Sequence, residues 1–181
     1  MNTLDMTTSD LKAQAQKSPF WQFSIKFYAV PDVAPACIAL QDEAGVDVNL
    51  LFFLLWNATL GRTLTEADIK ELDRMIGVWR NTAVIPLREL RRGLKSPSQI
   101  LTPDVAEGFR TRIKAVELEA ERLQQEAMYA LAQSGRFCQT APSPIEAARA
   151  SIAAYQTILR PFPPGPLQVV LAAFAKNASN R

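Results

Sequence analysis

The sequence contains no histidine and only two cysteines among its 181 residues. The lack of histidine removes the side chain that most often serves as a general base and as a metal ligand. Cys37 and Cys138 are far apart and form no CxxC pattern, which argues against a metal site or a disulfide framework. The 7 glycines are scattered and form no phosphate-binding loop. We therefore expect no metal, no cofactor and no nucleotide site.

Neither sign of charge is in large excess, and long apolar segments are also lacking. The 20 basic and 18 acidic side chains leave a net charge of +2, which gives no indication of a nucleic-acid partner. The charge-free run from Val48 to Gly61 is shorter than the roughly 20 residues that cross a bilayer. The N-terminal segment MNTLDMTTSD lacks the basic and apolar regions of a secretory signal. We expect a cytoplasmic protein with reduced cysteines and no membrane span.

Helix signals dominate what is present, and no segment shows the alternating pattern of a β-strand. Residues that can cap a first helical turn stand before several segments with helical apolar spacing. These predicted starts are Ser18-Pro19, Asp32, Asp47, Thr65, Thr102-Pro103 and Ser143-Pro144. Pro31, Gly45 and Gly61 are expected to end the first three of these helices. A polar helix over Asp10–Lys17 and an apolar helix over 167–176 complete the set.

The predicted fold is all-α, a single compact helical bundle of six to eight helices. The segment over 48–60 is apolar nearly all round, so it should be the central buried helix of this bundle. Residues 1–9 are expected to be a disordered N-terminus, and residues 10–160 the helical bundle domain. Residues 161–181 are expected to form a proline-rich linker and a C-terminal helix.

The longest predicted helix runs from Pro103 to about Ser134, and its apolar residues at helical spacing are expected to face inward. These residues are Val105, Phe109, Ile113, Val116, Leu123 and Leu131. The glutamates of 117–126 interleave with basic residues and are expected to form a solvated face of this helix. Pro86 predicts a kink or a short break near 81–86 in the preceding helical segment.

Asp47 and Asn49 are the sharpest polar feature, because they stand at the start of the apolar segment GVDVNLLFFLLW. The structural interpretation is that Asp47 caps the helix and Asn49 bonds to a neighbouring loop backbone. A buried amide without a partner would cost roughly 1–3 kcal/mol, so Asn49 must have one. The functional interpretation is a polar pocket in which Asn49 orients a ligand or the backbone of a partner.

A basic stripe is formed by Arg88, Arg91, Arg92 and Lys95, whose spacing places all four on one helix face. Arg80 extends it towards the N-terminus. The segment 31–47 carries acids and no basic residue, so the two segments could face each other or form solvated surface. Alternatively, the stripe binds an acidic protein or a phosphate group, which arginine forks match.

Residues 20–95 resemble an uncharacterised family of small all-helical bacterial proteins, a domain of unknown function. The resemblance rests on residues that are spread over this segment and on the basic segment IPLRELRRGLK (85–95). These residues are Phe20-Trp21, Tyr28, Pro31, Val33, Cys37, Leu40-Gln41, Gly45, Asp47-Val48-Asn49-Leu50, Phe53 and Trp56. The resemblance implies a small all-α cytoplasmic protein, and it implies no reaction, cofactor or substrate.

These observations favour a non-enzymatic interaction or adaptor protein that uses its basic helix face to bind an acidic protein or a phosphate group. The alternative is a carrier of an apolar small molecule, of acyl or isoprenoid type, held between helices rich in aromatic residues. An enzyme is the third hypothesis, because Cys37 has no histidine to activate it and no other nucleophile is indicated. The partner, the ligand and the oligomeric state stay open.

Overall fold

The computed structural model describes residues 18–96, 100–135 and 139–179. Its helices are α2 (Pro19–Tyr28), α3 (Val33–Ala44), α4 (Val48–Thr59), α5 (Glu66–Trp79), α6 (Ile85–Gly93), α7 (Pro103–Gln133), α8 (Pro144–Ile158) and α9 (Pro164–Ser179). A π-helix over Arg80–Val84 joins α5 to α6. The strands β1 (Arg62–Thr63) and β2 (Gln139–Thr140) form one short antiparallel pair. The all-α prediction is confirmed; the disordered N-terminus expected over 1–9 and the helix expected over Asp10–Lys17 lie outside the described residues.

The local start and stop signals act as the sequence predicts. Ser18 Oγ accepts a hydrogen bond from Trp21 N–H at 3.1 Å, with Pro19 in the first turn of α2. Gly45 ends α3 with a φ of 72°, in the left-handed region that favours glycine. Thr65 and Asp68 form a complete capping box at the start of α5. These termini are stabilised within one turn of chain, which is why a short sequence pattern is sufficient to locate them.

The buried centre of the molecule is α4, as predicted. Every residue from Asn49 to Ala58 is buried, and α4 packs against α2, α7 and α8. Aromatic rings fill the space between α2 and α4: Phe20 meets Phe53 edge-on at 5.3 Å between centroids, and it lies 5.5 Å from Trp56. Burial of such side chains contributes about 25 cal/mol per Å² of apolar area, so this cluster is a main source of stability.

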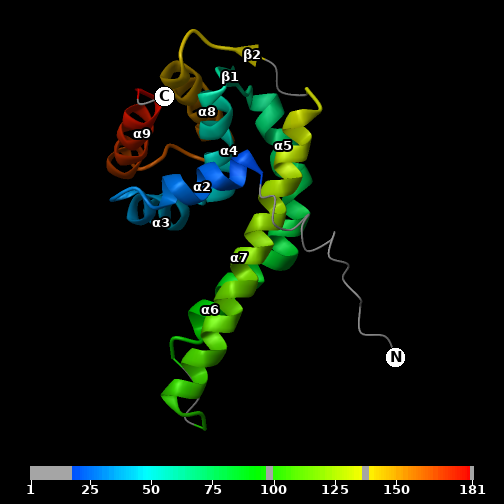
Figure 1. The fold of residues 1–181 in the computed structure, drawn as a ribbon, viewed down its shortest axis with the longest axis vertical. Coiled ribbons are helices and arrows are strands. Elements are labelled where there is room, and N and C mark those ends of the chain that lie inside the picture. Colours follow the sequence, from blue (N-terminus) through cyan, green and yellow to red (C-terminus); the bar gives the residue numbers. More distant parts are fainter. Residues whose placement is uncertain (1–17, 97–99, 136–138, 180–181) are drawn as a thin grey trace.

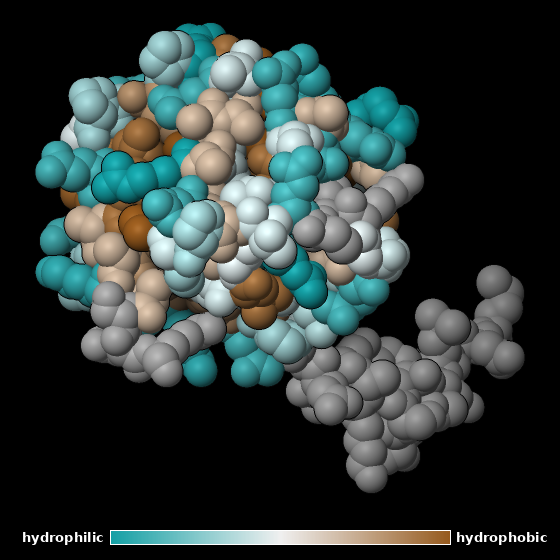
Figure 2. Space-filling view, turned by 90° about the horizontal axis from the view of Figure 1, so that it is seen from above, coloured by the Kyte–Doolittle hydropathy of each residue, from teal (hydrophilic) through white to brown (hydrophobic). Residues whose placement is uncertain are grey.

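One end of the molecule is drawn out into an arm. Figure 1 shows α6 and the N-terminal half of α7 extending away from the other helices, with α6 lying along α7. The rest of the structure forms a body in which α9 packs against α3 and α8. Seen from above, at the end of the body opposite the arm, hydrophobic residues appear only as separate patches among hydrophilic ones (Figure 2).

Asp32 stands at the N-cap position of α3, but the prediction that it caps this helix is wrong. Its side chain makes no capping hydrogen bond, and its φ is 66°, in the left-handed region. Pro31 fixes the chain before it, and the short connection from α2 to α3 requires a sharp turn there. Asp32 therefore supplies the left-handed backbone conformation of the turn, which aspartate tolerates better than most residues.

The break expected near 81–86 is a π-helix instead. Ile85 N–H donates to the carbonyl of Arg80, a bond that spans five residues and widens the helix just before Pro86. Because Pro86 has no N–H to donate, the wider turn lets the helix continue without the bond that proline removes. The helical path from α5 through α6 is thus continuous.

The proline-rich segment is also shorter than expected. The proline-rich linker expected between residue 161 and the helix over 167–176 ends earlier, because α9 begins at Pro164. Phe162 in this linker is buried and meets the ring of Tyr155 at 5.6 Å. Proline at a first helical turn lacks a bond that would be missing anyway, so Pro164 and Pro166 are compatible with the start of α9.

The largest error concerns the orientation of α7. Of the six residues predicted to face inward, Val105, Phe109, Val116 and Leu123 are exposed, whereas Ile113 and Leu131 are half-buried. The buried residues of α7 are instead Ala106, Glu117, Ala120, Gln124, Gln125, Met128 and Ala132. The prediction that the glutamates form a solvated face is wrong for Glu117. Hydrogen bonds and ion pairs with other helices, rather than apolar burial alone, determine which face of α7 packs.

Within the described residues, no single helix is long and apolar enough to cross a membrane. Only α2 and α3 together reach such a length and composition, and they are bent by 99° at the break between them.

Candidate functional site

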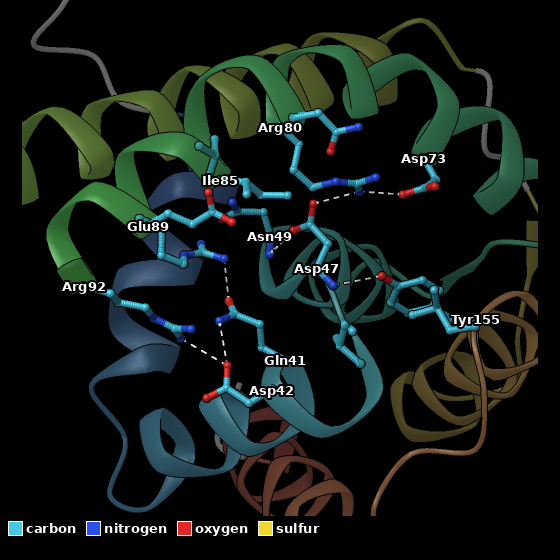
Figure 3. A pocket seen from close by; sticks show the side chains of 16 residues that line it. Gln41, Asp42, Asp47, Asn49, Asp73, Arg80, Ile85, Glu89, Arg92 and Tyr155 are labelled. Atoms are coloured by element: carbon cyan, nitrogen blue, oxygen red, sulfur yellow. Dashed lines mark hydrogen bonds and ion pairs between the residues drawn. The ribbon is translucent and has the colours of Figure 1, made fainter.

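A polar pocket of about 490 Å³ lies between the corner from α3 to α4 and the segment from α5 through the π-helix to α6 (Figure 3). Asp47, Asn49, Arg80, Arg88 and Arg92 all contribute to its lining. The fold therefore brings the two separate candidates of the sequence, the polar pair and most of the basic stripe, to one site. Of the other predicted residues, Arg91 and Lys95 do not line the pocket.

Asp47 links the pocket to the fold. One carboxylate oxygen, Oδ1, accepts the backbone N–H groups of Asn49 at 2.8 Å and Leu50 at 3.2 Å, which caps α4 as predicted. The other oxygen, Oδ2, accepts from Arg80 Nη1 at 3.1 Å and from Gln124 Nε2 at 3.0 Å. The side chain of Asp47 is only 8% exposed, so a single buried carboxylate holds α4, the π-helix and α7 together.

Arg80, the first residue of the π-helix, bridges two carboxylates. Its Nη1 donates to Asp47 Oδ2 and to Asp73 Oδ1, the latter at 2.6 Å (Figure 3). Burial by itself lowers the pKa of Arg80, but the hydrogen bonds and charges of Asp73 and Asp47 more than offset this and raise it. The cation is therefore permanent, and it is already paired inside the protein.

Asn49 has the internal partner that a buried amide requires, but the partner is not a loop backbone. Its Oδ1 accepts from Gln125 Nε2 at 2.6 Å. The adjacent residue, Gln124, donates a hydrogen bond to Asp47. Two consecutive glutamines of α7 therefore bind the carboxylate and the amide at the start of α4. The backbone N–H of Asp47 donates to the Tyr155 hydroxyl at 3.0 Å, which brings α8 to the same corner.

The acids that pair with Arg88 and Arg91 lie on α7, whereas only Arg92 and Arg80 form ion pairs with acids of the segment 31–47, namely Asp42 and Asp47. Arg88 donates to Glu117, to Glu121 at 2.7 Å and to Gln41 at 2.7 Å, and Arg91 forms hydrogen bonds with Glu117 through two nitrogens. The hydrogen bonds that Arg91 donates to Glu117 raise the pKa of Arg91, against the effect of burial. These bonds fasten α6 to α7 at the base of the arm, so Arg88 and Arg91 are occupied within the protein.

Arg92 differs from the other arginines of the stripe. Its side chain is 47% exposed, and its partner Asp42 is 49% exposed, with 3.1 Å between the guanidinium Nη2 and the carboxylate. The hydrogen bond from Arg92 is the main cause of the lowered pKa of Asp42. Exposed ion pairs of this kind contribute little to stability and exchange readily. Lys95 follows α6 and is exposed.

Both signs of charge line the pocket. Its carboxylates are Asp42, Asp47, Asp73 and Glu89, and its cations are Arg80, Arg88 and Arg92. A free phosphate with two negative charges would meet more carboxylates than guanidinium groups here. A single carboxylate that takes the place of Asp42 on Arg92 adds one negative charge to the pocket, half that of the phosphate. The arrangement therefore favours an acidic side chain over a phosphate group.

A family match covers most of this site. Residues 19–128 match the family described as a protein of unknown function (DUF2390). The chain belongs to this family. The predicted membership of an uncharacterised family is thus confirmed, and the match extends past residue 95 to include most of α7. No curated protein and no solved structure matches the chain.

Almost all of the residues that form the hydrogen bonds and ion pairs around the pocket lie within the matched region. Asp47, Arg80, Arg88, Glu117 and Gln124 all fall within residues 19–128, whereas Tyr155 lies beyond it. Sequence reasoning missed Glu117, Gln124 and Tyr155. Their burial depends on contacts that are at least 26 residues apart in the chain, such as that between Arg91 and Glu117. Residues 117–126 of α7 are mostly polar, so the sequence alone does not distinguish Glu117 and Gln124 from solvated surface residues.

Aromatic residues do not line this pocket apart from Tyr155, among the residues that the structure describes. The rings that suggested an apolar carrier pack on one another, as Phe27 does with Phe52 at 5.4 Å. The same part of the chain holds no group of three His, Cys, Asp or Glu side chains that could bind a metal ion.

Cys37 of α3 lies in the hydrophobic core, and this burial lowers the reactivity of its thiol. The side chain is fully buried, and burial raises the pKa of its thiol to about 12. The thiolate is therefore scarce at pH 8, and we expect a maleimide or aromatic disulfide reagent to modify Cys37 only on unfolding. Mass spectrometry of peptides labelled with and without denaturant measures this. Rapid labelling of Cys37 in the folded protein would contradict the expectation.

Proposed function

We propose that this protein is a non-enzymatic interaction protein that binds an acidic side chain of a partner protein at the polar pocket. The observation that carries this proposal is Arg92, an exposed arginine of the pocket lining that forms an ion pair with an equally exposed carboxylate, Asp42. A carboxylate of the partner replaces Asp42 there, which exchanges one ion pair for another. Arg80 and Arg88 hold the pocket walls in place through their buried bonds.

Only part of the basic stripe is available to bind a partner. Arg92 and Lys95 contact the partner, while Arg88 and Arg91 join α6 to α7 and Arg80 joins the π-helix to α4. The mixed charge of the pocket supports a protein over a phosphate group, because a peptide also offers amides and cations to the pocket carboxylates, such as Glu89. We place this interaction in the bacterial cytoplasm, in keeping with the buried Cys37 thiol.

Changes at the exposed ion pair test the proposal in two directions. Arg92→Gln is expected to reduce the recovery of co-purifying proteins at least tenfold, and Asp42→Asn to increase it, because Asp42 competes with the partner for Arg92. Quantitative mass spectrometry of proteins captured from the source cells measures recovery. Both side chains are exposed, so the melting temperature should change by less than about 2 °C.

Lys70→Gln is the matched control. It also removes one positive charge from an exposed ion pair, the one with Glu66 in α5, which does not line the pocket. Recovery should be unchanged in this variant. The proposal fails if Arg92→Gln and Lys70→Gln give the same recovery as the unmodified protein.

The apolar carrier stays a prediction that no contact in the described structure favours. Aromatic rings of α2 and α4 pack on one another, and charged side chains contribute much of the lining of the polar pocket.

A further inference from the structure

The exposed apolar face of α7 is a feature that the polar pocket does not explain. Val105, Phe109, Val116, Leu123 and Ala127 are all exposed. They lie within about 40° of one another around the helix, on a stripe beside the face that packs on α6 and the body. We call these five residues the α7 stripe. Contiguous exposed apolar surface of this kind marks an interaction site more often than scattered residues do.

The spacing of the α7 stripe is symmetric. Successive members are separated by four, seven, seven and four residues, so the pattern reads the same in both directions from Val116. Steps of seven are those of a coiled-coil seam. A two-fold axis at Val116 places Val105 opposite Ala127, Phe109 opposite Leu123, and Val116 opposite its own copy. This is the pattern that an antiparallel pair of identical helices needs.

We infer that two copies of this protein form a dimer in which their α7 helices pair antiparallel through the α7 stripe. The interface is isologous, so the same surface is used by both copies and the assembly closes at two. Because the arm extends away from the body (Figure 1), an antiparallel arrangement lets the arm of each copy lie along the upper part of α7 in the other.

The charges beside the stripe are self-complementary. Arg112 lies next to the stripe, with its guanidinium 5.6 Å from the centroid of the Phe109 ring. Glu119 follows seven residues later on the same flank, where its carboxylate also accepts from Arg122 of its own chain at the exposed surface. In the antiparallel register, Arg112 comes beside Glu119 of the second copy, twice by symmetry. A different protein whose facing surface carries charges of one sign would be repelled by either Arg112 or Glu119. A second copy of this chain, which carries both signs, therefore fits the flank better.

The neighbouring helix widens the apolar surface. Trp79 of α5 remains 41% exposed and donates its indole N–H at 2.9 Å to the carbonyl of Ala120, which is about one turn of α7 from Val116 and from Leu123. The stripe from Val105 to Ala127 is about 33 Å long at 1.5 Å per residue. One helix face with this flank is a small interface, so we expect a reversible dimer with a dissociation constant of about 1–100 μM.

Sedimentation velocity of the full chain from about 1 to 300 μM tests the inference. The unmodified protein is expected to pass from monomer to dimer in this range. Val116→Glu should remain monomeric, because two carboxylates would meet on the two-fold axis. Leu118→Glu is the matched control: Leu118 is 53% exposed and Val116 52%, but Leu118 lies on a different face of α7. A monomer at every concentration, or equal dimerisation of the two variants, would overturn the inference.

Disulfide trapping provides a second test that depends on the axis itself. In a Cys138→Ser background, Val116→Cys should form a disulfide-linked dimer under oxidised glutathione, since each copy presents the same residue at the axis. Leu118→Cys should remain monomeric under the same conditions. Cys37 is buried and does not compete. Equal trapping of the two variants would overturn the antiparallel register. That result is also expected if the chain dimerises through another surface.

Discussion

Asp47→Ala is expected to lower the free energy of unfolding by about 3–4 kcal/mol, one of the two largest effects we predict. The substitution removes the cap of α4, which contributes about 1 kcal/mol. It also leaves the buried Gln124 amide without its acceptor and the half-buried Arg80 with Asp73 as its remaining carboxylate, which costs about 2–3 kcal/mol more. Thermal or urea unfolding followed by circular dichroism measures the change.

Two comparison variants separate the cap from the network. Ser143→Ala removes a cap of similar geometry from α8, where the serine is not part of such a network, and should cost about 1 kcal/mol. Asp47→Asn retains an oxygen for the cap but loses the charge that Arg80 pairs with, so its stability should lie between those of Asp47→Ala and the unmodified protein. If Asp47→Ala costs no more than Ser143→Ala, the network around Oδ2 has no net effect on stability.

Glu117→Gln is expected to be the other strongly destabilising change, at about 2–3 kcal/mol. Glu117 is 5% exposed and accepts from both Arg88 and Arg91, so its loss removes the carboxylate paired with Arg91 and leaves Arg88 with Glu121 alone. Solvent moderates this effect, because the side chains of both arginines are about one-fifth exposed. The melting temperature should fall by roughly 4–10 °C.

Glu121→Gln is the matched control on the next turn of α7, and its effect should be close to zero. Burial is the main cause that raises the pKa of Glu121, against the opposing influence of Arg88. The folded state therefore disfavours the ionised carboxyl, and stability attributable to Glu121 falls as pH rises from its unfolded value towards its raised folded value. At pH 7 a neutral amide removes this penalty. A loss as large as that of Glu117→Gln would show that the two glutamates act as one unit.

The termini of the helices could be predicted because their causes are local. Ser18, Asp47, Thr65 and Ser143 each accept a backbone N–H from the first turn of the helix that follows, as the spacing of the residues indicates. The burial of α4 could be predicted as well, since its run of apolar residues leaves no face suited to water.

The face that α7 presents to its neighbours could not be predicted from apolar periodicity. Periodicity assumes that the most apolar face is the buried one, yet Glu117, Gln124 and Gln125 are buried and Val116 is exposed. Each of these polar side chains has a partner on a distant helix: Arg91, Asp47 and Asn49, respectively. A second copy that covers Val116 would restore the usual rule at the level of the dimer.

The sequence by itself determined the helical class, most of the helix ends and the identity of the central helix. The helix ends follow from hydrogen bonds within one turn, and the burial of the central helix follows from its almost entirely apolar side chains. Only the tertiary structure decided which polar residues meet. Asp47 and Arg80 are 33 residues apart and Arg88 and Glu117 are 29 apart, so nothing in the local chain fixes either pair. The pocket and the α7 stripe exist because these long-range pairs orient α6 and α7, which composition and spacing leave free to rotate.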